Sequence, residues 1–177
     1  MKVSYYLLGF LIRFGRQHGY SLKETIGREV ADFAKIKLPT IYYNLEKLMK
    51  QGYVTAAVEK DGNRPEKTVY EITDAGRKHF ALKTGEILKE YYEPEFTLDA
   101  VLYFWDQTDI KAVVQSLQKR TEILDTAIRA TQQHHQAVLP HIPPHAVFLA
   151  ESIFDHHLSH MRTELEWTQK VLKGFNR

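Results

Sequence analysis

The sequence contains no cysteine, and this absence excludes two kinds of stabilising chemistry. Without a thiol among its 177 residues, the chain can form neither a disulfide nor a thiolate metal site. At this length it can still bury a sizeable hydrophobic core without covalent links. Hydrophobic residues make up 44% and charged residues 26%, which is ordinary for a folded domain.

Long hydrophobic runs are also absent. No segment approaches the roughly 18 consecutive apolar residues of a membrane span. Lys2 and the following VSYYLLGFLI imitate the start of a signal peptide, but Arg13 and Arg16 come next and no small-residue cleavage site follows. This pattern does not fit a secretion signal. We therefore expect a cytoplasmic protein.

Sequence motifs of catalysis are missing as well. The chain has no GxSxG, no GxxxxGK[ST] and no dinucleotide-binding fingerprint, so nothing supports an enzyme or a cofactor. Of nine histidines, His156 and His160 stand four residues apart, with His157 between them. Such a helical pair is only half of a zinc site. We expect these histidines to be polar residues of an interface helix, with a metal-dependent hydrolase as the less favoured alternative.

The net charge of +2 is divided unequally along the chain. Residues 1–80 carry a net charge of +5, and residues 81–177 carry −3. A basic first half joined to an acidic second half suggests that only the first half meets a polyanion.

Helical periodicity and capping residues divide the first half into short elements. Apolar residues predict a helix over Val3–Phe14. Ser21 and Glu24 form a capping-box pattern that predicts the start of a second helix. Pro39 suits the first turn of a third helix, which Gly52 would end.

The pattern then changes from helical to extended. Apolar residues alternate over 54–58, a second extended segment lies near 68–70, and the Asp-Gly pair at 61–62 predicts a turn between them. A further helix should follow, capped by Thr73 or Asp74. Three helices, a two-stranded ribbon and another helix predict a winged helix-turn-helix.

The second half reads as helical, with two long amphipathic segments. Apolar residues recur at steps of three and four over 110–138 and again from Val147. Two such helices in an antiparallel hairpin cannot bury both of their apolar faces alone, so we expect a homodimer. The expected interface residues are Phe154, Leu158, Met161, Leu165 and Leu172.

These elements predict a mainly α (α+β) fold with three parts. Residues 1–82 would form the winged helix-turn-helix domain and residues 83–108 an aromatic-rich connecting segment. Residues 109–177 would form a helical, coiled-coil-like dimerisation domain.

The third predicted helix carries two stripes of residues with the same spacing. Ile41, Leu45 and Leu48 share one face, which should pack against the first two helices. A second stripe would point outward, where hydroxyl, phenol, amide and ammonium groups can reach base edges and phosphates in a major groove. An ordinary solvated helix face would fit the same residues. The outward stripe consists of Thr40, Tyr43, Asn44 and Lys47.

Basic residues accompany this stripe. Lys60, Arg64 and Lys67 surround the predicted wing turn, and Lys37 stands just before the third helix. Cations in these places can hold the phosphates beside the groove. Together with the stripe, they favour double-stranded DNA as the partner. A protein-interaction adaptor built on the same fold, without direct DNA binding, is the alternative.

Several strings in this order resemble the PadR family of transcriptional regulators. They are LLGFL, HGYSLKETI, PTIYYNLEKLMKQGYV, DGNRPEKTVYEIT and ITDAGRKHF, and HMRTELEWTQKVL resembles the last helix of the longer, subfamily-one members. The resemblance implies a dimeric repressor on an inverted repeat, with the C-terminal helices as the dimer interface. It also implies that Tyr42 lies near DNA. Two positions depart from the family pattern, because Tyr43 replaces a usual proline and Lys37 a usual small capping residue.

The candidate DNA contacts therefore come from the third helix, its start and the wing. They are Lys37, Thr40, Tyr42, Tyr43, Asn44, Lys47, Lys60, Asn63, Arg64 and Lys67.

Aromatic residues gather at the junction of the two halves, over 90–105. Proteins similar to PadR often sense phenolic compounds, and stacked rings suit such ligands. A hydrophobic hinge would explain the same residues. The candidate effector-binding residues are Tyr92, Tyr103 and Trp105.

Overall fold

A computed structural model describes residues 2–30, 36–60, 66–91 and 93–175. The chain folds into two compact units, Met1–Glu93 and Pro94–Arg177, and each is described by itself. The predictions for Asn63, Arg64 and Tyr92 lie outside the described residues. Among the helices of the described part, none is both long and apolar enough to cross a bilayer.

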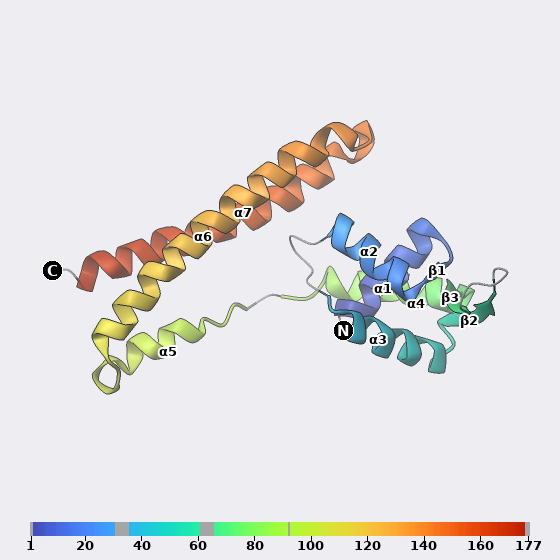
Figure 1. Ribbon diagram of the computed structural model, residues 1–177, viewed down its shortest axis with the longest axis horizontal. Coiled ribbons are helices and arrows are strands. Elements are labelled where there is room, and N and C mark those ends of the chain that lie inside the picture. Colours follow the sequence, from blue (N-terminus) through green and yellow to red (C-terminus); the bar gives the residue numbers. More distant parts are fainter. Residues whose placement is uncertain (1, 31–35, 61–65, 92, 176–177) are drawn as a thin grey trace. The chain divides into compact units, whose positions relative to one another are not determined.

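The first unit is a winged helix-turn-helix, as predicted (Figure 1). Its sheet has the antiparallel order β1-β3-β2, so β3 is the central strand. The elements are α1 (Lys2–Phe14), β1 (Gln17–His18), α2 (Gly19–Glu29), α3 (Leu38–Lys50), β2 (Val54–Glu59), β3 (Lys67–Ile72) and α4 (Asp74–Ile87).

The core of this unit lies where α1, α2 and α3 meet. Each helix contributes apolar residues at helical spacing, and β3 adds the side chains that face them. A fully buried leucine or isoleucine stabilises the fold by about 1.5–3 kcal/mol relative to an exposed one. The most deeply buried members are Leu7, Leu8, Leu11, Leu22, Ile26, Ile41, Leu45 and Leu48.

The start of α2 differs from the prediction. The helix begins at Gly19, after His18, whose side chain makes no capping hydrogen bond, so Ser21 is not the N-cap. The reason is β1, a strand that the sequence pattern does not predict. Gln17 and His18 pair with Tyr70 and Val69 of β3, which fixes the chain just before the helix.

The end of α3 follows the prediction. Gly52 has φ +75°, a conformation that favours glycine. The N–H of Gly52 donates to the carbonyl of Met49, and the N–H of Tyr53 donates to that of Leu48, both at 2.9 Å. These two bonds close the helix in the manner of a Schellman motif.

Thr73 caps α4, one of the two residues predicted for this role. Its hydroxyl accepts from the N–H of Gly76 at 3.0 Å and donates to the Gly52 carbonyl at 2.8 Å. Gly76 lies so close to Tyr53 that a Cβ would overlap the Tyr53 carbonyl oxygen. The helix continues to Ile87, beyond the predicted end of the first domain at residue 82.

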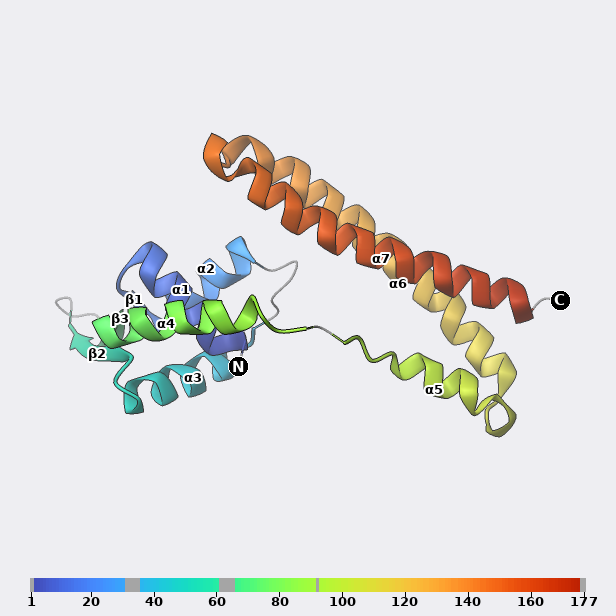
Figure 2. The ribbon, with the colours of Figure 1, turned by 180° about the vertical axis from the view of Figure 1, so that it is seen from behind.

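The second unit contains the long helices α6 (Ile110–Val138) and α7 (Val147–Phe175), each of 29 residues. They run side by side in opposite directions (Figures 1 and 2). Arg120 of α6 and Glu164 of α7 form an ion pair across the hairpin at 2.6 Å. The shorter elements are α5 (Thr97–Tyr103) and the 3-10 turns η1 (Trp105–Gln107), η2 (Leu139–His141) and η3 (Pro144–Ala146).

The seam of this hairpin changes the expected dimer interface. Phe154 and Leu158 are only 8% and 7% exposed within the single chain, and the ring of His135 stacks on Phe154 with ring centroids 4.5 Å apart. These two predicted interface residues therefore pack inside the hairpin and leave little surface for a second chain. Met161, Leu165 and Leu172 are half-buried.

Candidate nucleic-acid interface

The two predicted stripes of α3 face opposite ways in the structure. Ile41, Leu45 and Leu48 are buried against the core. Thr40 and Lys47 are exposed, and 68% of Tyr43 is exposed. The helix thus offers hydroxyl, phenol and ammonium groups to a partner on its outer side.

Asn44 differs from the rest of the outward stripe, because its side chain is held within the domain. The residue is half-buried, and its Oδ1 accepts a hydrogen bond from the hydroxyl of Ser4 at 2.7 Å. Its Nδ2 donates to the backbone carbonyl of Thr40 at 2.8 Å. The amide therefore joins α3 to α1, and a bidentate contact to adenine would need these bonds to break.

An acidic residue outside the predicted stripe shares the outer side of α3. Glu46 is exposed and forms an ion pair with Lys50 at 2.7 Å. The hydrogen bond and the positive charge of Lys50 lower the pKa of the Glu46 carboxyl. Glu46 thus remains ionised, and it offsets part of the positive charge that Lys47 and Lys50 bring to the helix.

Cations at the start of α3 and at the ends of β2 and β3 are exposed. Lys37 precedes α3 as its N-cap residue and is exposed. Lys60 follows β2 and Lys67 begins β3, and both are exposed. Since Lys67 is paired in register with Glu59, the end of the ribbon carries both signs of charge.

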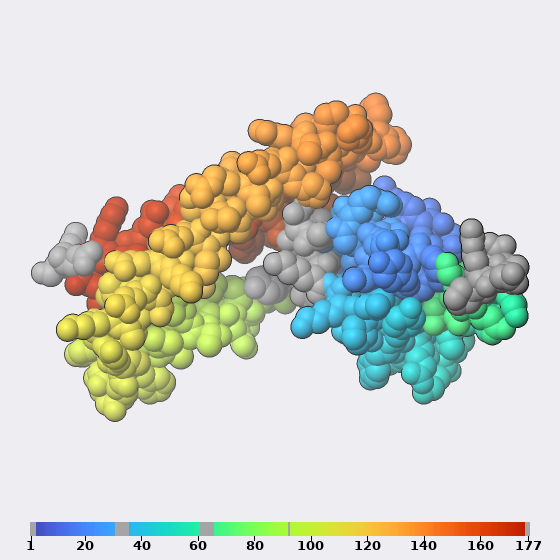
Figure 3. All heavy atoms as spheres, in the orientation of Figure 1, coloured from blue at the N-terminus to red at the C-terminus, as the bar shows by residue number. Residues whose placement is uncertain are grey.

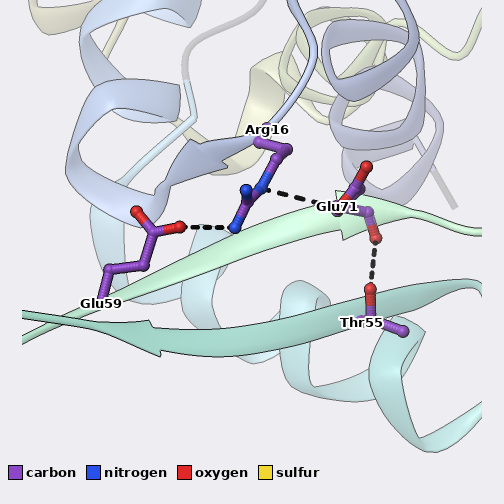
Figure 4. A network of polar contacts seen from close by, with 4 residues as sticks. All are labelled: Arg16, Thr55, Glu59 and Glu71. Carbon is purple, nitrogen blue, oxygen red and sulfur yellow. Dashed lines mark hydrogen bonds and ion pairs between the residues drawn. The ribbon is translucent and has the colours of Figure 1, made fainter.

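Arg16 lies between two wing carboxylates, as Figure 4 shows. Its guanidinium forms ion pairs with Glu59 and, at 3.6 Å, with Glu71. Thr55 donates to the Glu71 carbonyl at 3.4 Å, across β2 and β3. Arg16 therefore neutralises one acidic group on β2 and one on β3.

A cavity of about 380 Å³ lies beside the first turn of α2. Tyr70 is the most deeply buried of its phenols, 8% exposed. Burial, followed by the nearby Tyr42, raises the pKa of Tyr70, so its hydroxyl stays protonated at neutral pH. The lining residues are His18, Gly19, Tyr20, Tyr42, Glu66, Lys67, Thr68 and Tyr70. Sequence periodicity gave no sign of this cavity, because β1 and the uncapped start of α2 create it.

The second unit holds the remaining candidates. Tyr103 and Trp105 are exposed, and the Tyr103 ring meets Phe104 edge-on at 4.9 Å. The rings of His156 and His160 lie 4.9 Å apart. Within the described ranges, no group of three His, Cys, Asp or Glu side chains is placed to hold a metal ion.

The fold and the exposed side of α3 define the class of the first unit. It is a winged helix-turn-helix domain. The second helix of its helix-turn-helix is α3, and its wing is the β2–β3 ribbon. Residues 7–82 match the family model described as the transcriptional regulator PadR-like family. Over these residues the chain is similar to that family.

Comparisons with individual proteins extend the likeness. The chain is 31% identical over 102 residues to the negative transcriptional regulator PadR of Bacillus subtilis, a match that covers 56% of each chain. It thus spans little more than half the length of that curated relative.

Solved structures match nearly the whole chain. Bacillus subtilis PadR in complex with operator DNA has a TM-score of 0.74 at 19% identity, with 98% of both chains covered. The same protein in complex with p-coumaric acid has a TM-score of 0.73 at 18% identity, with 99% of both covered. The Vibrio cholerae virulence activator AphA has a TM-score of 0.77 at 19% identity, with 98% of both covered. At these identities the likeness concerns the fold.

Proposed function

We propose that this protein is a sequence-specific DNA-binding transcription regulator, in which α3 enters the major groove and the wing contacts the adjacent backbone. The observation that carries the proposal is the exposed row of Thr40, Tyr43 and Lys47 on α3, beside the exposed wing cations Lys60 and Lys67. Hydroxyl and ammonium groups on a groove-sized helix can reach base edges, while cations on the flank hold phosphates. The proposal implies a location in the cytoplasm, with the DNA.

We further propose that the protein acts as a homodimer on an inverted repeat. Twofold symmetry would place the two copies of α3 about one turn of DNA apart, roughly 34 Å, or a multiple of that. The apolar residues for an interface lie outside the hairpin seam, since the second unit exposes large apolar side chains that a single chain leaves uncovered. They include Ile123 on α6 and Phe148, Leu149 and Ile153 on α7. In Figure 3 a long side of α6, yellow to orange, faces solvent.

Repression and release by an aromatic effector complete the proposal. The relative with 31% identity is a negative regulator, which supports repression, although the same fold serves an activator in Vibrio cholerae. A neighbour in fold was solved with p-coumaric acid, which supports a phenolic effector. The exposed rings of Tyr103 and Trp105 are the proposed contacts, with Tyr92. An effector changes DNA affinity only if it binds one state of the dimer better than the other.

The test is binding to the DNA upstream of the protein's own gene. Fluorescence anisotropy should show a tighter complex with this DNA than with a random duplex of equal length, weakening steeply as salt rises. Lys47→Ala should weaken binding. Lys170→Ala removes the same charge from α7, in the second unit, and serves as the matched control. Equal weak binding to both duplexes, with no dependence on salt, would contradict the proposal.

Two further measurements test the remaining parts. Sedimentation should give a particle of twice the chain mass, and Ile153→Glu should shift it toward the monomer. Addition of p-coumaric acid should release the operator. A strictly monomeric protein that still binds an inverted repeat tightly would contradict the dimer proposal.

A further inference from the structure

Within the described part of the chain, the hydroxyl of Tyr70 has no hydrogen-bond partner. Tyr70 lies on the central strand, between Gln17 of β1 and Ala56 of β2, and is 8% exposed. Among the described residues its hydroxyl makes no hydrogen bond, although it lines the cavity. The ring is buried, and its hydroxyl can donate a hydrogen bond to a molecule that enters the cavity.

The first turn of α2 supplies a second set of donors. Its N-cap residue, His18, has extended backbone angles and no capping side-chain bond, so the first backbone N–H groups of the helix lack a side-chain acceptor. The N-terminal end of a helix carries a partial positive charge and attracts anions. The 11-residue helix α2 therefore faces the cavity with an end that favours negative charge.

Gly19 allows the α3 phenol to lie against this helix end. A Cβ on Gly19 would overlap the Tyr42 ring and would lie 3.0 Å from its hydroxyl oxygen. Tyr42 is thus held beside the uncapped turn only because residue 19 has no side chain. The cavity consequently brings together groups from α2, α3 and β3.

The lining is rich in hydrogen-bond donors. Tyr42, Thr68 and Tyr70 offer hydroxyls, and Lys67 adds an ammonium group. Glu66 is the single carboxylate among the lining residues, and it is exposed. Such a set favours a ligand that accepts hydrogen bonds from several directions and carries negative charge, which describes an oxyanion.

We infer that this cavity is an oxyanion site that accepts one backbone phosphate of bound DNA, with the Tyr70 hydroxyl as one of its donors. The inference rests on the proposed function, since DNA must be the partner of α3. The phosphate belongs to DNA because Tyr42 of α3 and Lys67 of the wing both line the cavity, which places it between the two elements that would contact the duplex. Phosphate contacts of this kind position a protein on DNA without reading its sequence.

The decisive variant is Tyr70→Phe, which removes only the hydroxyl. Binding to the specific and the random duplex should fall alike, by about 10-fold, because the lost bond goes to a charged group. The salt slope should stay unchanged, since the hydroxyl is neutral, whereas Lys67→Ala should reduce the slope by about one. Tyr53→Phe is the matched control, because Tyr53 stacks on His79 outside the cavity, and it should bind as the wild-type protein does.

Duplexes that each carry one neutral methylphosphonate locate the contact. At one backbone position in each half-site, the methylphosphonate should weaken binding by the wild-type protein. The same modification should not weaken binding by Tyr70→Phe any further, because that variant already lacks the contact. A deficit of Tyr70→Phe that persists on every modified duplex would mean that the substitution acts through the fold, and would overturn the inference. Wild-type affinity of Tyr70→Phe would also overturn it and leave the proposed function intact. If the wild-type protein itself fails to bind DNA, the proposed function fails first.

A free anion is the competing source of the same chemistry, and inorganic phosphate tests it. One outcome would assign the cavity to a free oxyanion and overturn the assignment to DNA. In that outcome, the NMR signals of the Tyr70 ring shift when phosphate is added at constant ionic strength, and Tyr70→Phe binds DNA as the wild-type protein does. Inorganic phosphate that competes with DNA for the wild-type protein, and less for Tyr70→Phe, would support the shared site.

Discussion

The hydroxyl of Ser4 donates a hydrogen bond to Oδ1 of Asn44, 2.7 Å away, and so joins α1 to the outer part of α3. The amide nitrogen Nδ2 of Asn44 is engaged as well, because it donates to the Thr40 carbonyl. Asn44, which its spacing places on the outward stripe, thus helps to set the position of α3. Asn44 should therefore affect DNA binding by positioning α3.

Removal of either partner should destabilise the domain. We expect Asn44→Ala to lower the free energy of unfolding by about 1–2 kcal/mol and Ser4→Ala by about 1 kcal/mol, because each leaves a half-buried polar atom unpaired. Urea denaturation of both variants and of the double variant would measure a coupling energy of about 1 kcal/mol. Strict additivity would show that the bond contributes nothing.

The same variants distinguish positioning from base contact. If Asn44 positions α3, Ser4→Ala should reproduce part of the loss of specific DNA binding seen with Asn44→Ala, although Ser4 lies on another helix. If Asn44 breaks its internal bonds to reach a base, only Asn44→Ala should lose affinity, by about 1–3 kcal/mol. Anisotropy titrations of both variants on specific and random duplexes decide between the two.

Lys67 should contribute affinity without sequence preference. It is exposed at the start of β3, and a phosphate contact there would weaken alike for all sequences when the ammonium is removed. Lys67→Ala should therefore lower the affinity for specific and random DNA by the same factor and reduce the salt slope by about one. A loss confined to the specific duplex would show that Lys67 reads a base.

Arg16 should matter more for DNA binding than for stability. Exposed ion pairs contribute about 0–1 kcal/mol, and the three side chains of this network are each about half exposed. Arg16→Ala should thus leave urea unfolding nearly unchanged. It should weaken DNA binding several-fold at low salt, because Glu59 and Glu71 would then repel phosphates without a neutralising cation.

The double variant provides the control for this network. Adding Glu59→Gln to Arg16→Ala should restore much of the lost affinity, since it removes one of the exposed negative charges. If the double variant binds no better than Arg16→Ala alone, Arg16 acts through its own contact with DNA.

Periodicity and end signals were sufficient to predict most elements of the fold. The apolar spacing of Ile41, Leu45 and Leu48 identified the buried side of α3, because a helix of 3.6 residues per turn leaves no other arrangement. Pro39 and Gly52 marked its ends, since each residue type suits one terminus. The strand β1 could not be predicted in this way, because two residues carry no periodic pattern.

Partners far apart in the sequence explain the remaining differences. Spacing placed Asn44 on a face but could not reveal Ser4, which lies 40 residues away in the chain. Likewise, the stripe through Phe154 and Leu158 was correctly apolar, yet periodicity does not say whether a helix of the same chain or of another covers it. Here α6 covers these residues.

Gly76 should tolerate no side chain. A Cβ there would overlap the Tyr53 carbonyl oxygen and would lie 2.7 Å from Cγ1 of Ile72. We expect Gly76→Ala to lower the free energy of unfolding by about 2 kcal/mol or more, although alanine normally favours a helix over glycine. Gly85→Ala on the same helix is the control, because no atom lies within 4 Å of a Cβ at that position, and it should stabilise the domain slightly.

Alkaline pH should destabilise the first unit partly through Tyr70. Burial raises the pKa of this phenol above its ordinary value near 10. The unfolded chain therefore releases its proton first as the pH rises, and the contribution of Tyr70 to stability, complete below pH 10, is lost as the pH passes through the folded-state pKa. Tyr6, whose pKa is also raised by burial, should act in the same direction.

Urea unfolding between pH 9 and 11.5 should give Tyr70→Phe a shallower loss of stability than the wild-type protein. Parallel curves for the two proteins would show that the phenol is not protected from ionisation, and would remove one reason for regarding it as a neutral donor.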